Sequence, residues 1–468
     1  MTTLDAEVAQ IPQAGLYKNW YKVVLLVAII PMTWLFSRAL DFSNGQTARA
    51  ASALEASNHS HPASELTNYR LVYHDEFNQA RLDETKWYPY RLPHWTTPAT
   101  VSGSQAKYTI NNGVLTLTTE EQIAWSPWDQ NNVFSTLMTG EYAGQAGSKD
   151  GLHEFGNCIQ LDECVVSPQF SNLSVQLGVF RYGYFELRAK APAGSRASWW
   201  MVGFEDDPQH SAEIDVFEYN AAKPTQWGPK CVHFGIHAWE DSNIVGESFY
   251  FGDDCTNYQT WNTYGLLWLP DHITLYVNGV PVKTIEQSPR YKMVTILDAA
   301  RWSTEPHNQF EIDYFRVYQL PQIVNLSAKM LNGSPGWGHI AAHAVDHNDA
   351  TYAQAYTGQE NWDLEIGLND RYILNAITLN LDTTNWATNF TLDVRDESGT
   401  WHTIKNITNG NPAIQHFTFS PPVVGHAIRV NVTAENDGGN APHAIREVEI
   451  YGTLFQPNST YLPIIFRD

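Results

Sequence analysis

Three acidic residues fall within six positions of one predicted β-strand, in the run Glu213-Ile214-Asp215-Val216-Phe217-Glu218. Because side chains alternate along a strand, Glu213 and Asp215 share one face, while Ile214 and Val216 point into the core. A regular strand would turn Glu218 towards the core. A β-bulge at Val216-Phe217 would instead return Glu218 to the face of the other two acids. The spacing therefore predicts three carboxylates on one side of a sheet.

Carboxylates packed this closely repel one another, so at least one of their pKa values should be raised. One ionised and one protonated carboxyl group is the pair that glycoside hydrolysis requires, at a separation of about 5–5.5 Å in a retaining mechanism. An exposed acidic strand face and a calcium site are the competing interpretations. The catalytic one is favoured because Trp199-Trp200-Met201 precedes the run on a predicted strand.

The elements that must position these acids are short strands separated by turn residues, and no long amphipathic helix is evident. Alternating patterns predict strands at 114–118, 183–190 and 310–318, and Asn278-Gly279 predicts a hairpin between 273–277 and 280–282. This density of strands over roughly 250 residues indicates one β-sandwich. A second strand-rich block spans about 325–452, with predicted strands at 377–381, 390–394 and 427–432.

We therefore divide the chain into an N-terminal segment with a linker (1–65), a large β-domain (66–320), a smaller β-domain (324–453) and a tail (454–468). The apolar run Val23–Phe36, followed by Ala48-Arg49-Ala50, predicts a signal peptide, with an uncleaved membrane anchor as the alternative. In either case the domains are expected outside the cell, secreted or held at the outer face of the membrane. We expect a monomer.

Composition excludes one class of partner and favours another. The formal net charge of −22 argues against nucleic acid, which needs basic patches. The 17 Trp and 23 Tyr fit an all-β core or aromatic platforms for sugar rings. Four cysteines, Cys158, Cys164, Cys231 and Cys255, lack a Cys-x-x-Cys pair. In an exported chain the simplest pairing is Cys158–Cys164 and Cys231–Cys255, although the sequence does not fix the connectivity and free thiols are the alternative.

The large block resembles glycoside hydrolase family 16, the laminarinase, lichenase, agarase and carrageenase group. The resemblance covers about Leu71 to Gln319, and its motifs come in family order: His74-Asp75-Glu76-Phe77 with Lys86-Trp87, Tyr182–Arg188, Glu213–Glu218, Trp268-Leu269-Pro270-Asp271, and Asp313–Tyr318. It implies a β-jelly-roll sandwich with an open cleft and retaining endo-hydrolysis of a polysaccharide, without a catalytic cofactor.

The resemblance also implies roles for single residues. Glu213 would be the nucleophile, Asp215 its assistant and Glu218 the acid/base. His237 falls where the family often places a cleft histidine, with a core histidine as the alternative.

Substrate-binding candidates are implied in the same way. Trp200 aligns with the family's sugar-stacking tryptophan, and Trp199 is then a core residue, or the reverse, since neighbours on a strand face opposite ways. Trp95 is a further candidate. Arg196 departs from the laminarinase pattern of a second tryptophan, which weakens the expectation of a β-1,3-glucan. Arg196 could contact a charged or galactan-type sugar, or be a solvated loop arginine. A β-1,3- or mixed-linkage glucan or a galactan is therefore expected.

The second block resembles a discoidin-like, factor type C carbohydrate-binding module of the family 32 kind, which implies a smaller β-sandwich. The resemblance is carried by Asn325–Ala328, Ala344–Tyr352, Trp362–Gly367 and Arg446–Gly452. It implies a structural calcium ion, with Asp346, Asp349, Thr351 and Glu447 as ligands by position. The alternative is that these residues make turn and capping hydrogen bonds.

Two other functions use the same scaffold. An inactive sugar-binding surface protein usually lacks one of the acids, whereas all three are present here. A transglycosylase shares the acids but excludes water from the second step, and the sequence does not separate it from a hydrolase.

Overall fold

The computed structural model describes residues 66–456, except 67, 92–100, 121–131, 143–173, 208, 221–229, 303–304, 333–334, 337, 357–360, 413 and 436–442. These residues all belong to the compact unit Asn58–Asp468. The N-terminal segment, most of the tail, Trp95, Cys158 and Cys164 lie outside the described residues. In the part of the chain described here, no helix has both the length and the apolar character needed to cross a membrane.

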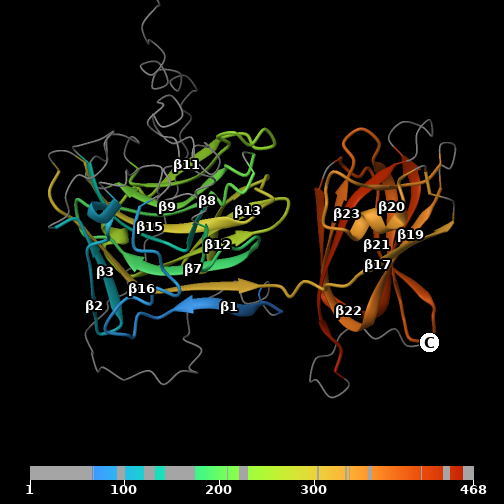
Figure 1. Cartoon of the computed structure of the whole chain (residues 1–468), viewed down its shortest axis with the longest axis horizontal. Helices are drawn as coiled ribbons and strands as arrows, with labels where there is room; N and C mark the ends of the chain where they lie inside the picture. The colour runs from blue at the N-terminus through green and yellow to red at the C-terminus, as the bar shows by residue number, and fades with distance from the viewer. Residues whose placement is uncertain are drawn as a thin grey trace, which may run out of the picture. The chain divides into compact units, whose positions relative to one another are not determined.

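The structure confirms an all-β fold (Figure 1), and antiparallel strands from the first block form two large sheets. The eight-stranded sheet has the order β14-β13-β12-β7-β16-β3-β2, with β1 paired to β16. Its strands are β1 (Arg70–Asp75), β2 (Tyr108–Asn111), β3 (Val114–Thr118), β7 (Gly183–Lys190), β12 (Asn262–Trp268), β13 (Ile273–Val277), β14 (Val280–Ile285) and β16 (Gln309–Gln319).

The six-stranded sheet has the order β11-β10-β9-β8-β15-β4 and carries the acidic run. Its strands are β4 (Asn132–Met138), β8 (Arg196–Gly203), β9 (Glu213–Asn220), β10 (Val232–His237), β11 (Glu247–Phe251) and β15 (Met293–Trp302). A two-stranded ribbon of β5 (Gly140–Tyr142) and β6 (Ser174–Gln176), and the 3-10 turns η3 (Val101–Ser104) and η6 (Cys255–Gln259), complete this block.

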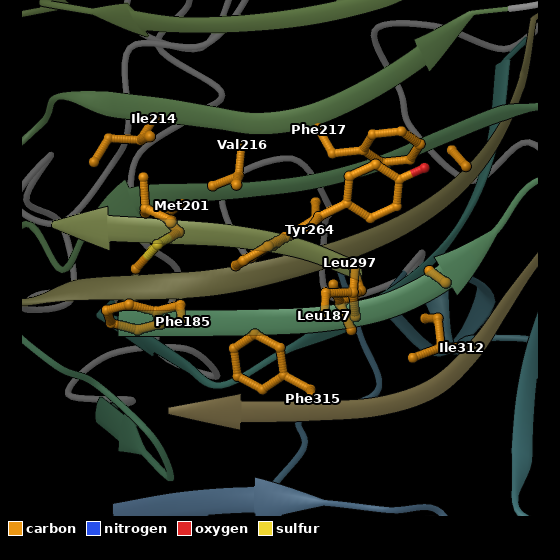
Figure 2. Close-up of a cluster of buried hydrophobic side chains, with 14 of the residues drawn as sticks. Phe185, Leu187, Met201, Ile214, Val216, Phe217, Tyr264, Leu297, Ile312 and Phe315 are labelled. Carbon is orange, nitrogen blue, oxygen red and sulfur yellow. The ribbon is translucent and has the colours of Figure 1, made fainter. Parts of the chain in front are cut away.

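One apolar core joins the two large sheets (Figure 2). It combines Phe185 and Leu187 of the eight-stranded sheet with Ile214, Val216 and Phe217 of the six-stranded sheet, all fully buried. Burying one face of each sheet leaves the other face of β9 available for polar groups. The predicted hairpin is confirmed, since Asn278 and Gly279 take φ values of 50° and 74° between β13 and β14. These are the positive φ angles that a two-residue Asn-Gly turn requires.

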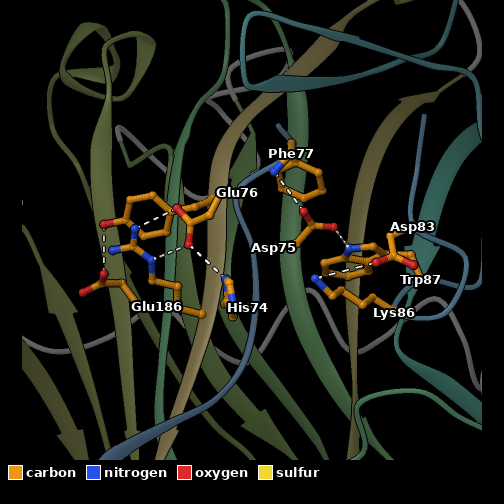
Figure 3. Close-up of polar contacts among 10 residues, drawn as sticks. His74, Asp75, Glu76, Phe77, Asp83, Lys86, Trp87 and Glu186 are labelled. Carbon is orange, nitrogen blue, oxygen red and sulfur yellow. Dashed lines mark hydrogen bonds and ion pairs between the residues drawn. The ribbon is translucent and has the colours of Figure 1, made fainter. Parts of the chain in front are cut away.

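Polar contacts fix the first strand against β16 (Figure 3). Asp75 accepts hydrogen bonds from the backbone N–H of Phe77 at 2.9 Å and from Nε1 of Trp87 at 3.0 Å. Arg316 on β16 binds both carboxylate oxygens of Glu76, at 2.8 and 2.7 Å. The acidic and aromatic residues of the opening motif are therefore structural.

The second block forms its own seven-stranded sheet, in the order β18-β23-β19-β22-β20-β21 with β17 on β19. Its elements are β17 (Ser327–Asn332), η7 (Ala341–Val345), β18 (Ala353–Gln354), β19 (Asp363–Leu381), β20 (Ala387–Arg395), β21 (Trp401–Ile407), β22 (Ile414–Glu435) and β23 (Ala444–Leu454). It encloses a separate core that includes Trp362, Leu379 and Ile428. The expected discoidin-like β-sandwich is confirmed.

Candidate active site

A β-bulge on β9 brings the three acids to one face of the six-stranded sheet, as the spacing predicted. Against β8, Trp200 pairs with Asp215 and Trp199 pairs with Phe217, so Val216 is the extra residue. Against β10, the same shift lets His233 oppose Glu218 while His237 opposes Glu213. Val216 and Phe217 both lie in the apolar core. The extra residue therefore returns Glu218 to the face of Glu213 and Asp215.

Asp215 is the centre of the polar network. Nε2 of His237 donates to its Oδ2 at 3.0 Å, and Nδ1 of His233 lies 3.4 Å from the same oxygen. Glu213 shares a side-chain hydrogen bond with Asp215. Nδ1 of His233 also donates to Oε2 of Glu218, at 2.7 Å. The network therefore links all three acids through Asp215 and two histidines of the neighbouring strand.

The network separates the pKa values of Glu213 and Asp215. Burial, followed by the charge of Asp215 and the hydrogen bond shared with it, raises the pKa of Glu213 well above its ordinary value. Burial also acts to raise the pKa of Asp215, but the hydrogen bond from His237 and the charges of His233 and His237 outweigh it and lower that pKa. The network therefore shifts the pKa values of these two neighbouring carboxyl groups in opposite directions.

The pKa values of Glu218, His233 and His237 are all raised. Burial, then the charge of Asp215, raises the pKa of Glu218, against the opposing hydrogen bond from His233. Burial opposes ionisation of His233 and His237, but the hydrogen bonds to Glu218 and Asp215 prevail and raise both pKa values. The Glu218 side chain is 36% exposed, so it can meet an incoming oxygen atom.

His233 and Trp239 are parts of the site that sequence reasoning missed. His233, Gly235 and His237 alternate on β10, and this period of two was the available signal for His233. The His233 ring lies against Gly235, where an added Cβ would come within 2.7 Å of Nε2. Trp239 follows β10 and donates from Nε1 to Oε2 of Glu213 at 2.8 Å. Its indole is 40% exposed, so it is also an accessible ring beside the acids.

The two tryptophans of β8 take opposite faces. Trp199 is fully buried and packs edge-on against Phe315 at 5.8 Å, so the expectation that it lies in the core is confirmed. The reverse assignment, with Trp199 as a substrate-binding residue, was wrong. Trp200 lies on the face of Asp215, but it is only 6% exposed. Its Nε1 donates to Asp298 at 2.9 Å, and the Arg91 guanidinium lies 5.3 Å from its ring centroid. Stacking of a sugar on Trp200 stays a prediction.

Arg196 does not present its charge to a sugar. It begins β8, is 6% exposed, and donates from Nε and Nη2 to the two carboxylate oxygens of Glu305, both at 2.8 Å. Its guanidinium lies 4.1 Å from the ring centroid of Trp302. The predicted sugar contact was therefore wrong, and so was the alternative of a solvated loop arginine, because a two-pronged ion pair occupies the group.

Cys231 and Cys255 are free thiols in this structure, so the predicted disulfide between them was wrong. Sγ of Cys231 lies 3.1 Å from the carbonyl oxygen of Gly252. Burial, then contact with the Cys255 thiol, raises the pKa of Cys231 above its ordinary value. The two thiols are neighbours, and the Cys231 thiol is held in the protonated form.

Of the four expected calcium ligands, Asp346, Asp349 and Thr351 lie between η7 and β18, whereas Glu447 lies on β23. Oδ1 of Asp349 accepts a hydrogen bond from Nδ2 of Asn380 at 2.8 Å. Oγ1 of Thr351 donates to both oxygens of Asp346 at 3.0 and 2.8 Å, and the N–H of His347 donates to Oε2 of Glu447 at 2.8 Å. These are turn hydrogen bonds of the alternative kind. Oε1 of Glu447, however, is buried and has no hydrogen-bond partner among the described residues. An unpaired buried carboxylate oxygen fits a cation, and burial raises the pKa of Glu447 to about 8.

The chain spans less than two thirds of the curated relatives that it matches. The chain is 24% identical over 284 residues to a keratan-sulfate endo-1,4-beta-galactosidase of Sphingobacterium multivorum, covering 55% of this chain and 57% of that protein. It is 24% identical over 232 residues to glucan endo-1,3-beta-glucosidase A1 of Niallia circulans, covering 46% of this chain and 29% of that protein. A GlcNAcα1-4Gal-releasing endo-β-galactosidase from Clostridium perfringens aligns in structure over 85% of this chain and 99% of its own, with 19% identity and a TM-score of 0.44.

Two family models match separate parts of the chain. The model of glycosyl hydrolases family 16 matches residues 159–316, which include β7 to β15 and therefore the whole carboxylate network. The model of the F5/8 type C domain matches residues 326–448. The chain therefore carries a family 16 glycosyl hydrolase domain followed by an F5/8 type C domain.

Proposed function

We propose that the protein is a retaining endo-β-glycosidase that hydrolyses internal linkages of a polysaccharide. The observation that carries the proposal is the bulged strand β9, which places Glu213, Asp215 and Glu218 on one face within a single hydrogen-bonded network. A retaining mechanism needs one carboxylate to attack the anomeric carbon and one carboxylic acid to protonate the leaving oxygen. Glu213 is the proposed nucleophile and Glu218 the acid/base.

Asp215 tunes the nucleophile in this proposal. Its charge and the hydrogen bond that it shares with Glu213 raise the pKa of Glu213. Glu213 attacks only in its ionised form, so Asp215 helps to set the pH above which the nucleophile becomes available. His233 and His237 face Asp215 and compensate its negative charge. Glu218 then donates its proton to the leaving oxygen and later removes one from the attacking water.

The proposed substrate class is a β-glucan or a galactan. The names of the two curated relatives refer to a galactosidase and a glucosidase. Arg196 is committed to Glu305, which leaves no support for recognition of an acidic sugar by that residue. We further propose that the protein acts outside the cell and that its F5/8 type C domain holds the enzyme on its glycan.

Two variants test the roles separately. Glu213→Gln should abolish turnover and form no covalent intermediate with a 2-fluoro glycoside. Glu218→Gln should lose activity on polysaccharide but still form the intermediate from a substrate whose leaving group needs no protonation, and azide should accelerate its release. Product analysis on laminarin, mixed-linkage glucan, agar, carrageenan and porphyran would distinguish hydrolysis from transglycosylation. Wild-type turnover in Glu213→Gln would refute the assignment.

A further inference from the structure

The ligand atoms of Asp215, His233 and His237 form a compact group on the face of β9 and β10. They lie within 4.8 Å of one another, and no other set of three or more His, Cys, Asp or Glu residues does so in the described ranges of the chain. Oδ2 of Asp215 is 3.0 Å from Nε2 of His237 and 3.4 Å from Nδ1 of His233. Two of the three ligand separations are thus 3.4 Å or less.

These separations match those around a tetrahedral zinc ion. Zn–N bonds of about 2.0–2.1 Å and Zn–O bonds of about 2.0–2.2 Å place neighbouring tetrahedral ligands roughly 3.3 Å apart. Glu218 is at hand for the fourth position, since its Oε2 lies 2.7 Å from Nδ1 of His233. Two imidazoles and carboxylates favour zinc, copper or nickel over magnesium or calcium, which prefer oxygen donors alone.

The surrounding residues hold the ligands in place and leave a path to them. The His233 ring lies between Gly235 and the ring of Tyr250, whose centroid is 4.8 Å away. Antiparallel pairing of His233 with Glu218 and of His237 with Glu213 places both histidines opposite the acids. The His237 side chain is 40% exposed, so an ion from solvent can reach the group. Ligands fixed by packing bind a metal with little reorganisation.

From this geometry we propose that Asp215, His233 and His237 bind one divalent transition-metal ion of the zinc type, and that the bound ion inhibits the glycosidase. The ion would occupy Asp215, which breaks the hydrogen bond that it shares with Glu213, and would draw Glu218 away from a leaving oxygen. The site is therefore an inhibitory metal site beside the three acids. The inhibition rests on the proposed glycosidase function, whereas metal binding does not.

Binding is measured first, on the full chain stripped with a chelator. Calorimetric titration with Zn²⁺ should show one tight site, and titration with Co²⁺ should give the intense visible absorption of a tetrahedral ion. His237→Ala and His233→Ala should each weaken Zn²⁺ binding at least about 100-fold, because each removes a direct ligand. Far-UV circular dichroism would establish that both variants are folded.

His402→Ala is the matched control, because Nε2 of His402 lies 2.6 Å from Asp396 without a third ligand nearby in the described structure. This variant should retain the wild-type Zn²⁺ affinity and Co²⁺ spectrum. Unchanged binding in folded His237→Ala, or a Co²⁺ spectrum without tetrahedral bands, would overturn the site. If the protein degrades a polysaccharide, Zn²⁺ should inhibit it at concentrations that match the dissociation constant. Binding without inhibition would overturn the inhibitory role.

Discussion

Replacing Trp239 with phenylalanine removes one hydrogen bond from the proposed nucleophile and keeps an aromatic ring in its place. The bond that is lost runs from Nε1 to Oε2 of Glu213 at 2.8 Å. Hydrogen bonds to charged groups contribute about 1.5–3 kcal/mol. Because the indole is 40% exposed, water can partly replace it, and the lower end of about 1.5 kcal/mol applies. One pKa unit corresponds to about 1.36 kcal/mol, so the expected change in the pKa of Glu213 is about one unit.

The direction of the change follows from which form the indole stabilises. The N–H donates to the carboxylate, so it opposes the burial and the Asp215 charge that raise the pKa of Glu213. Its removal raises that pKa further. The acidic limb of the profile of kcat/KM against pH should therefore move up by about one unit in Trp239→Phe. On that limb the variant should be about tenfold slower, whereas the plateau at higher pH should change little.

The assay is hydrolysis of the active polysaccharide between pH 4 and 9, with EDTA present so that no metal ion occupies Asp215. The acidic limb reports the titration of Glu213 and Asp215 as a coupled pair. Wild type and variant are therefore compared by how far this limb moves along the pH axis. Trp302→Phe is the control, because Trp302 is similarly exposed and its contact is with the Arg196 guanidinium. An acidic limb that stays in place, or moves to lower pH, would refute the reasoning.

Three further predictions concern stability. Asp298→Asn should lower the free energy of unfolding, measured in urea, by about 3–5 kcal/mol. The reason is that buried Arg91, which lies 2.5 Å from Asp298, loses its counter-charge. A loss below about 1 kcal/mol would contradict this. Burial raises the pKa of Glu205 well above its ordinary value, so its contribution to stability is lost as pH rises from the unfolded pKa of about 4.3. Glu205→Gln should therefore raise Tm more at pH 8 than at pH 4, and equal shifts at both values would count against it. Calcium should raise the Tm of the wild-type chain, and EDTA should reverse the rise. The Tm of Glu447→Gln should rise less with calcium. A wild-type Tm that does not change on adding calcium would exclude the site.

Much of the fold was predictable because its signals are local. Alternation of apolar and polar residues marked the strand at 183–190 with the bounds that β7 has, and Asn278-Gly279 marked its hairpin. The bulge was predictable for a related reason. Three acids at the spacing of Glu213, Asp215 and Glu218 can share a face only if one residue is added between the last two. The need to bring all three acids to one face therefore predicted the β-bulge.

The wrong predictions concern partners that are distant in the sequence. Arg196 was assigned to a sugar, but Glu305, 109 residues further on, binds it. Nothing local marks that pair, because it depends on how β8 and the segment after β15 meet. The placement of Trp199 and Trp200 depended partly on the local pattern and partly on strand register. Alternation showed that one must be buried, and only the register with Asp215 decided which one.

His233 shows how a site residue can be inferred once one register is known. Trp200 opposes Asp215 on one side of β9, and Gly235 opposes it on the other. The residues two positions either side of Gly235 must then lie on the face of Asp215, and both are histidines. Glycine between them leaves room for the ring of His233, which an alanine at that position would displace. The pattern His-x-Gly-x-His on the strand beside an acidic bulge therefore places two histidines on either side of the carboxylate that shares a hydrogen bond with the proposed nucleophile.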